Sequence, residues 1–277
     1  MKLKNQMYCG AQGKSAHYDL YLPEHFNGTL ICFVHGYMGY KDWGAWNVMA
    51  DYFYDRNFGF AKLNLSHNGT NVEHLSHFVD LEAFSKNCYS FEYEDVIAFR
   101  LSLDEKLNAL HINVEKHILF GHSRGGATIL ISAKAFKADA LVSWASISDI
   151  ESRFPKGEAF DDWKASGVYF RKNGRTHQDM PHEFSAYQDF MKHKTQFHLE
   201  SLAKAVDCPW LILHGTADSS VDISNSKNLK SWQKNAQFIE IEHANHTFGS
   251  REPYTETQLP DVMLEACKAT ELFLKSI

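Results

Sequence analysis

A serine stands between glycines in the segment Gly121-His122-Ser123-Arg124-Gly125, which has the pattern G-x-S-x-G. It follows an apolar segment and precedes one with helical spacing. In such a strand-to-helix turn the backbone passes so close to its neighbours that glycine is needed two residues to either side, and the serine Oγ is exposed above the sheet. The following helix would direct backbone N–H groups and a positive dipole toward a developing oxyanion. The segment therefore predicts a nucleophilic serine rather than a purely structural turn.

A nucleophilic serine needs a general base and an acid that orients the base. Asp218 follows the apolar segment 209–215, and His246 follows the last apolar segment, 236–243. If these segments are parallel strands, all three residues lie in loops at the same edge of one sheet. We therefore predict a catalytic triad in which Ser123 is the nucleophile, His246 the base and Asp218 the acid.

Other residues compete for two of these roles. His243 lies three residues before His246 and could be the base if the last strand ended earlier. Asp222 shares the loop of Asp218, and Asp149 ends the segment 140–148, so either could be the acid. The triad prediction stands first because the chain order Ser123, Asp218, His246 is the order expected of this architecture.

Several histidines raise the question of a metal site. His74 and His77 have H-x-x-H spacing, and His67 is nearby. No H-E-x-x-H pattern or cysteine partner accompanies them, as zinc sites would require. No metal ligand is predicted.

The elements that would position these residues alternate between strand and helix. Apolar strand-like segments occupy 29–36, 58–65, 116–123, 140–148, 209–215 and 236–243. Segments with helical spacing occupy 45–57, 92–110, 125–137 and 260–277. This alternation predicts an α/β fold with a doubly wound, mostly parallel sheet, and the segment 17–28 predicts an antiparallel strand that leads into it.

One long stretch interrupts the alternation after the sixth predicted strand. Residues 151–204 contain no clear buried strand and are rich in polar and aromatic residues. Because the stretch lies between two sheet strands, we expect it to cross the edge where α/β sheets bind ligands. We predict one domain, with an α/β core at 1–150 and 205–277 and a cap at 151–204.

With these motifs the sequence resembles the α/β-hydrolase superfamily over nearly its whole length. The segments His-Gly-Thr-Ala-Asp at 214–218 and Ala-Asn-His-Thr-Phe at 244–248, together with the insertion, resemble the branch of dienelactone hydrolases, serine aminopeptidases and cinnamoyl or feruloyl esterases. The resemblance implies a serine hydrolase that works through an acyl-enzyme and needs no cofactor.

The resemblance also implies an oxyanion hole. The segment His35-Gly36-Tyr37 would supply one half, so that the backbone N–H groups of Tyr37 and Arg124 are the two donors. His35, Gly36, Gly121, His122 and Gly125 would support the site, with His122 in a packing and hydrogen-bonding role. The Arg124 side chain either orients the turn through a buried salt bridge, pairs with a cap carboxylate or attracts an acidic substrate.

The amino-acid composition limits the classes of partner that the protein can be expected to bind. The chain has 277 residues, a formal net charge of −6 and 44% hydrophobic residues, which is typical of a globular domain without a basic surface for nucleic acid. It has no apolar run of roughly 18 residues, as a membrane helix would need, and no apolar signal segment near residue 1. Its five scattered cysteines favour reduced thiols. We expect a cytoplasmic monomer or homodimer that acts on a small-molecule ester and has no nucleic-acid or membrane partner.

The function predicted from the sequence is hydrolysis of carboxylic esters. Two alternatives remain open, namely a peptidase or amidase that uses the same triad and a non-catalytic homologue that binds a ligand. The fold does not fix the leaving group. A comparison of ester and amide substrates is therefore needed to decide between the two activities.

Overall fold

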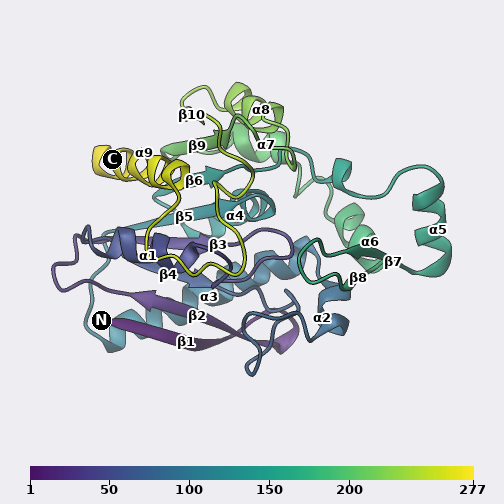
Figure 1. The fold of residues 1–277 in the computed structure, drawn as a ribbon, viewed down its shortest axis with the longest axis horizontal. Coiled ribbons are helices and arrows are strands. Elements are labelled where there is room, and N and C mark those ends of the chain that lie inside the picture. The colour runs from purple at the N-terminus through teal and green to yellow at the C-terminus, as the bar shows by residue number, and fades with distance from the viewer.

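Eight strands form a single sheet in the order β1-β2-β4-β3-β5-β6-β9-β10 in the computed structural model, which describes all 277 residues (Figure 1). The strands are β1 (Lys2–Cys9), β2 (Ser15–Tyr21), β3 (Thr29–Val34), β4 (Gly59–Leu63), β5 (Lys116–His122), β6 (Ala140–Trp144), β9 (Trp210–Gly215) and β10 (Gln237–Ile241). From β4 to β10 neighbouring strands are parallel, whereas β2 is antiparallel to both β1 and β4. The α/β fold with a mostly parallel, doubly wound sheet is thus confirmed.

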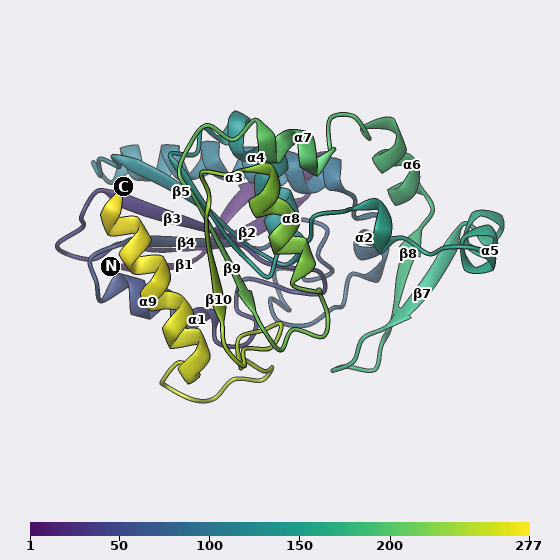
Figure 2. The same cartoon turned by 90° about the horizontal axis from the view of Figure 1, so that it is seen from above.

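Helices cover both faces of this sheet (Figure 2). One face packs against α1 (Trp46–Tyr54) and α9 (Asp261–Ser276), which share a buried apolar cluster with it. The other face packs against α3 (Tyr89–Ala109), α4 (Arg124–Phe136), α7 (Leu199–Lys204) and α8 (Ser224–Trp232). Because β3, β4, β6 and β9 are covered on both faces, every residue in them is buried, and this is why they read as continuous apolar runs.

The six strands predicted from apolar runs all occur within the expected segments. Several elements were not predicted, among them β1, the short helix α2 (Leu81–Lys86) and the helices and hairpin within residues 151–204. Strand β1 lies at the edge of the sheet, and most of its residues are exposed or half-buried. An edge strand of this kind lacks the apolar run that revealed the others.

The insertion, defined here as residues 151–204, leaves the sheet after β6 and returns to it at β9. It contains α5 (Glu158–Ser166), the antiparallel hairpin of β7 (Val168–Lys172) and β8 (Asp179–Glu183), α6 (Ser185–Lys192) and α7. Figures 1 and 2 show α5, α6 and the hairpin standing out from one end of the molecule. In contrast, α7 contacts α4 and α8 of the core.

Aromatic side chains hold the protruding part of the insertion together. Trp163 on α5 is 1% exposed, and its ring lies 5.1 Å from that of Phe184 and 4.9 Å from that of Tyr169. Phe160 contacts Tyr187 in the same group, with ring centroids 4.9 Å apart. The insertion therefore has a small aromatic core of its own. Among the helices of the whole chain, none has the length and hydrophobicity needed to cross a bilayer.

Candidate active site

Ser123 occupies the turn between β5 and α4. Its backbone has φ 56° and ψ −118°, a conformation that costs free energy for any residue with a side chain. A Cβ built on Gly121 would lie 2.3 Å from the carbonyl oxygen of Gly125, and one built on Gly125 would lie 2.4 Å from that of Val34. The two glycines are thus required by close backbone approach, which is the physical reason inferred from the sequence.

Replacing Gly121 or Gly125 by alanine is expected to lower the free energy of unfolding by at least about 2 kcal/mol, because rigid backbone atoms must move to admit the methyl group. Urea unfolding followed by circular dichroism would measure this loss. Gly174→Ala is the matched control, since its φ is not positive and a Cβ there would contact nothing within 4 Å. Equal stability of all three variants would contradict the steric explanation.

Three loops at the carboxyl edge of the sheet bring Ser123, Asp218 and His246 together. His246 Nε2 lies 3.0 Å from Ser123 Oγ, and His246 Nδ1 lies 2.7 Å from Asp218 Oδ2. The loops follow β5, β9 and β10, as the sequence suggested. This geometry connects a hydroxyl, an imidazole and a carboxylate in the order that general-base activation of a serine requires.

The competing residues lie elsewhere. His243 is exposed, and its backbone N–H donates to Thr216 Oγ1. Asp222 is exposed and accepts from the Ser224 backbone N–H, while Asp149 is exposed and accepts from that of Ser152. No hydrogen bond links any of these three side chains to Ser123 or His246.

The carboxylate of Asp218 is buried and fully hydrogen-bonded. Its side chain is 1% exposed, and its Oδ1 accepts the backbone N–H groups of Ser220 and Val221. His214 Nε2 lies 3.2 Å from Oδ2. Burial alone would raise the pKa of Asp218, but the hydrogen bonds from His214 and His246 outweigh it and hold the pKa well below its ordinary value. Asp218 is therefore ionised beside His246.

His214 had no role in the sequence-based prediction. It is completely buried at the end of β9, where Nδ1 lies 2.7 Å from Ser226 Oγ and Nε2 lies 2.9 Å from the Val221 carbonyl. It thus fixes the loop that carries Asp218. A histidine four residues before Asp218, inside an otherwise apolar strand, was the available signal.

Two further histidines hold the loops around Ser123. Burial lowers the pKa of His122 to about 3, so it is neutral, and its Nε2–H donates to the backbone carbonyl of His246 at 2.8 Å. Burial likewise lowers the pKa of His35 to about 4. Its Nδ1–H donates to the Gly36 carbonyl, and its Nε2 accepts from the Leu65 N–H.

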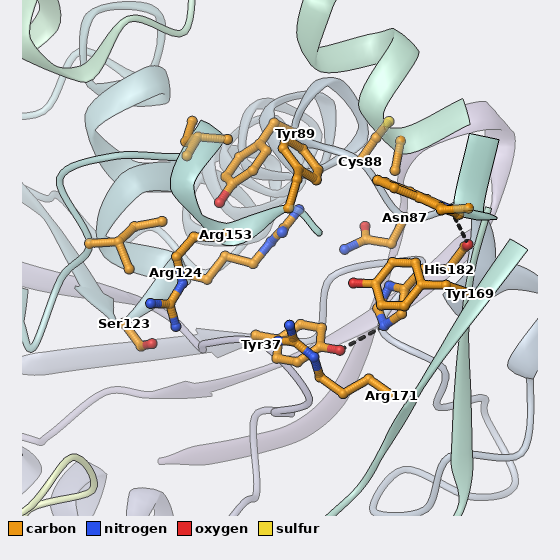
Figure 3. A pocket seen from close by; sticks show the side chains of 15 residues that line it. Tyr37, Asn87, Cys88, Tyr89, Ser123, Arg124, Arg153, Tyr169, Arg171 and His182 are labelled. Atoms are coloured by element: carbon orange, nitrogen blue, oxygen red, sulfur yellow. Dashed lines mark hydrogen bonds between the residues drawn. The ribbon is translucent and has the colours of Figure 1, made fainter. Parts of the chain in front are cut away.

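The loop after β3 lies directly against the serine turn. A Cβ built on Gly36 would lie 3.0 Å from Ser123 Cβ, so the backbone of this loop approaches Ser123 closely. The Tyr37 N–H makes no hydrogen bond to the protein, and neither does the Arg124 N–H, which begins α4. The Tyr37 side chain reaches the insertion, where its hydroxyl lies 2.7 Å from His182 Nε2 on β8 (Figure 3).

The Arg124 side chain pairs with a carboxylate of the core, not of the insertion. Its Nε donates to Glu92 Oε1 of α3 at 2.6 Å, and Glu92 is 1% exposed. Its guanidinium also lies over the Tyr89 ring, 3.9 Å from the centroid. Glu92 in turn accepts from Thr128 Oγ1 and Asn87 Nδ2.

Two cavities meet at Ser123. The first lies between the core and the insertion and is lined by 15 residues, among them Ser123, Tyr37, Tyr89, Trp163 and Tyr169 (Figure 3). The second is lined by 14 residues, including Ser123, His246 and Arg175. A substrate bound at Ser123 can therefore place one part in each of the two cavities.

The histidines at 67, 74 and 77 do not form a cluster. His67 is buried against Phe91, with ring centroids 4.7 Å apart, and lies 2.8 Å from Ser66 Oγ. His74 and His77 are exposed. The chain contains no group of three or more His, Cys, Asp or Glu side chains arranged to hold a metal ion, and its five cysteines are free thiols.

The sheet, its helices and the serine turn define the α/β-hydrolase fold. Solved structures of this fold resemble the chain closely in three dimensions at low sequence identity. Est1E from Butyrivibrio proteoclasticus, in a structure with bound ferulic acid, gives a TM-score of 0.69 at 16% identity and covers 96% of this chain and 98% of its own. A putative hydrolase from Agrobacterium vitis S4 gives 0.70 at 16% identity, with 99% and 97% covered. A puromycin-hydrolyzing peptidase of Mycobacterium tuberculosis gives 0.62 at 18% identity, with 98% of this chain but 38% of its own covered.

A family model identifies the group more closely. The model of the prolyl oligopeptidase family matches residues 81–260, a range that includes Ser123, Asp218 and His246. This chain belongs to that family, whose members and structural neighbours are α/β serine hydrolases. A search of curated proteins gives no match.

Proposed function

We propose that this serine hydrolase cleaves carboxylic esters through an acyl-enzyme, with Ser123, His246 and Asp218 as its catalytic triad. The observation that carries the proposal is the chain of two hydrogen bonds from Ser123 Oγ through His246 to the buried Asp218. The strained backbone of Ser123 supports it further, since such conformations concentrate at functional sites.

In the proposed reaction His246 Nε2 takes the proton of Ser123 as Oγ attacks the ester carbonyl. Asp218 keeps the imidazole in the tautomer that presents Nε2 to the serine, and it stabilises the imidazolium that forms. The imidazolium then protonates the leaving alcohol. Water, deprotonated by His246, attacks the acyl-enzyme and releases the acid, so that Ser123 and His246 return to their initial states.

The backbone N–H groups of Tyr37 and Arg124 would stabilise the oxyanion of each tetrahedral intermediate. Both amides lack an acceptor in the protein and belong to segments that meet at Ser123. One such donor typically contributes about 3 kcal/mol to transition-state stabilisation. The insertion would act as a cap that closes one wall of the first cavity, to which it contributes Phe154, Trp163 and Tyr169.

Peptide or amide hydrolysis is the second candidate. The observation in its favour is the match to the prolyl oligopeptidase family. The same triad can expel an amine, because His246 would protonate either leaving group. Ester hydrolysis ranks first because the chain forms a fold of the same extent as Est1E, covering 98% of it, whereas it covers only 38% of the puromycin-hydrolyzing peptidase.

The deciding experiment compares p-nitrophenyl esters of increasing acyl length with aminoacyl p-nitroanilides, alongside covalent labelling by a fluorophosphonate. We expect turnover of esters with kcat/KM well above that of anilides, and labelling at Ser123. Faster cleavage of anilides would favour the peptidase. Failure of both turnover and labelling would favour a non-catalytic ligand-binding protein.

A further inference from the structure

We propose that the acyl part of the substrate carries a carboxylate of its own, which the arginines of the first cavity bind. The substrate class is thus a half-ester of a dicarboxylic acid. This inference rests on the proposed ester hydrolysis and specifies the substrate for the same site.

The position of His246 identifies which cavity receives the acyl part. His246 must protonate the leaving alcohol, so the alcohol lies on the side that the imidazole lines. His246 lines the second cavity and not the first. The acyl chain therefore extends from Ser123 into the first cavity, between the core and the insertion.

The first cavity carries an uncompensated positive charge. Its lining includes three arginines, Arg124, Arg153 and Arg171, and no aspartate or glutamate. Glu92 lies behind the lining and neutralises Arg124, whereas Arg153 and Arg171 form no salt bridge. Figure 3 shows the three arginines around the same space as Ser123, although they come from α4, the turn at Glu151–Arg153 and β7.

The Arg124 guanidinium is held in a fixed orientation. Glu92 binds its Nε, Tyr89 lies against its face, and its two terminal amino groups donate no hydrogen bond within the protein. A planar guanidinium with free amino groups suits a carboxylate, which it can bind through two parallel hydrogen bonds. Arg153 and Arg171 are exposed and can approach the same anion.

The remaining walls suit a carbon chain between the ester and the anion. Tyr37, Tyr89, Phe154, Trp163 and Tyr169 present aromatic surfaces to the cavity. His182 on its wall is neutral and adds no charge, because burial, with Arg124 and Arg171 nearby, lowers its pKa to about 3. An apolar chain that ends in a carboxylate matches both the aromatic walls and the guanidinium groups of Arg153 and Arg171, which form no salt bridge.

The test compares monomethyl adipate with dimethyl adipate, two esters that share one chain and differ in a single charge. We expect the wild-type protein to favour the half-ester in kcat/KM by roughly tenfold or more, the usual effect of one charge-assisted hydrogen bond. Arg171→Gln and Arg153→Gln should each reduce this preference, and the double variant should reduce it further, leaving the part that Arg124 supplies. Arg251→Gln, whose side chain is 72% exposed, is the matched control and should keep the preference.

Equal kcat/KM for the two esters in the wild type, or a preference that the double variant keeps in full, would overturn the carboxylate proposal and leave ester hydrolysis intact. If neither adipate ester is cleaved, calorimetric titration of adipate into the Ser123→Ala protein decides. Binding that the double arginine variant loses would support the anion site, and no binding would overturn it. Failure of the proposed function is recognised separately, by absent fluorophosphonate labelling and absent turnover of every p-nitrophenyl ester.

Discussion

Replacing Ser123 by alanine is expected to lower kcat for p-nitrophenyl butyrate by at least about 10⁴-fold, because no other hydroxyl is hydrogen-bonded to His246. Triad nucleophiles removed from serine hydrolases leave only the catalysis supplied by binding and the oxyanion donors. The fold should persist, since alanine keeps the Cβ and the backbone of the turn. Release of p-nitrophenolate at saturating substrate measures the effect, and thermal unfolding verifies the fold.

Ser220→Ala is the matched control for this substitution. Ser220 lines the second cavity together with Ser123, but it supports Asp218 through its backbone N–H, which alanine retains. We expect its kcat to stay within about twofold of the wild type, as for a surface substitution away from the reacting groups. A Ser123→Ala protein that kept wild-type turnover would refute the proposed nucleophile.

Changing Asp218 to asparagine is expected to lower kcat by about 10⁴-fold, the loss known for the equivalent change in a serine protease triad. The amide cannot hold the His246 tautomer that presents Nε2 to Ser123, and it cannot stabilise the imidazolium. The asparagine oxygen can still accept the N–H groups of Ser220 and Val221, so the loop should keep its shape. Turnover of p-nitrophenyl butyrate measures the loss.

Asp222→Asn and Asp149→Asn test the competing acids with the same chemical change. Both carboxylates are exposed and form hydrogen bonds only within their own turns. We expect neither variant to lose more than about twofold in kcat. If either variant lost most of its kcat while the Asp218→Asn protein stayed active, the substituted aspartate of that variant would be the acid instead of Asp218.

The sequence was sufficient to predict the parts of the molecule that depend on local chemistry. Buried parallel strands must be apolar on both faces, so β3, β4, β6 and β9 were visible as runs. The serine turn was visible because its close backbone contacts admit only glycine at Gly121 and Gly125. Those contacts are with residues near in the chain or in the adjacent strand.

Features that depend on packing between segments far apart in the sequence were not predictable in the same way. Strand β1 is polar and lies at the sheet edge, and the hairpin of β7 and β8 stands largely outside the core, so neither has an apolar signature. The pairing of Arg124 with Glu92 joins α4 to α3, and the approach of Arg153 and Arg171 to Ser123 depends on how the insertion packs. Side-chain spacing along one segment carries no information on such pairs.

Tyr37 belongs to two parts of the molecule at once. Its backbone lies in the loop against Ser123, and its hydroxyl contacts His182 on the hairpin. The hairpin cannot move away without breaking this contact or displacing the loop. If a ligand binds the Tyr37 backbone more tightly when the hairpin is in place, thermodynamic linkage requires that the ligand stabilise this position of the hairpin by the same free energy. Such a ligand bound at Ser123 would therefore also stabilise the hairpin. Slower amide hydrogen exchange in β8 would then report that the ligand is bound at Ser123.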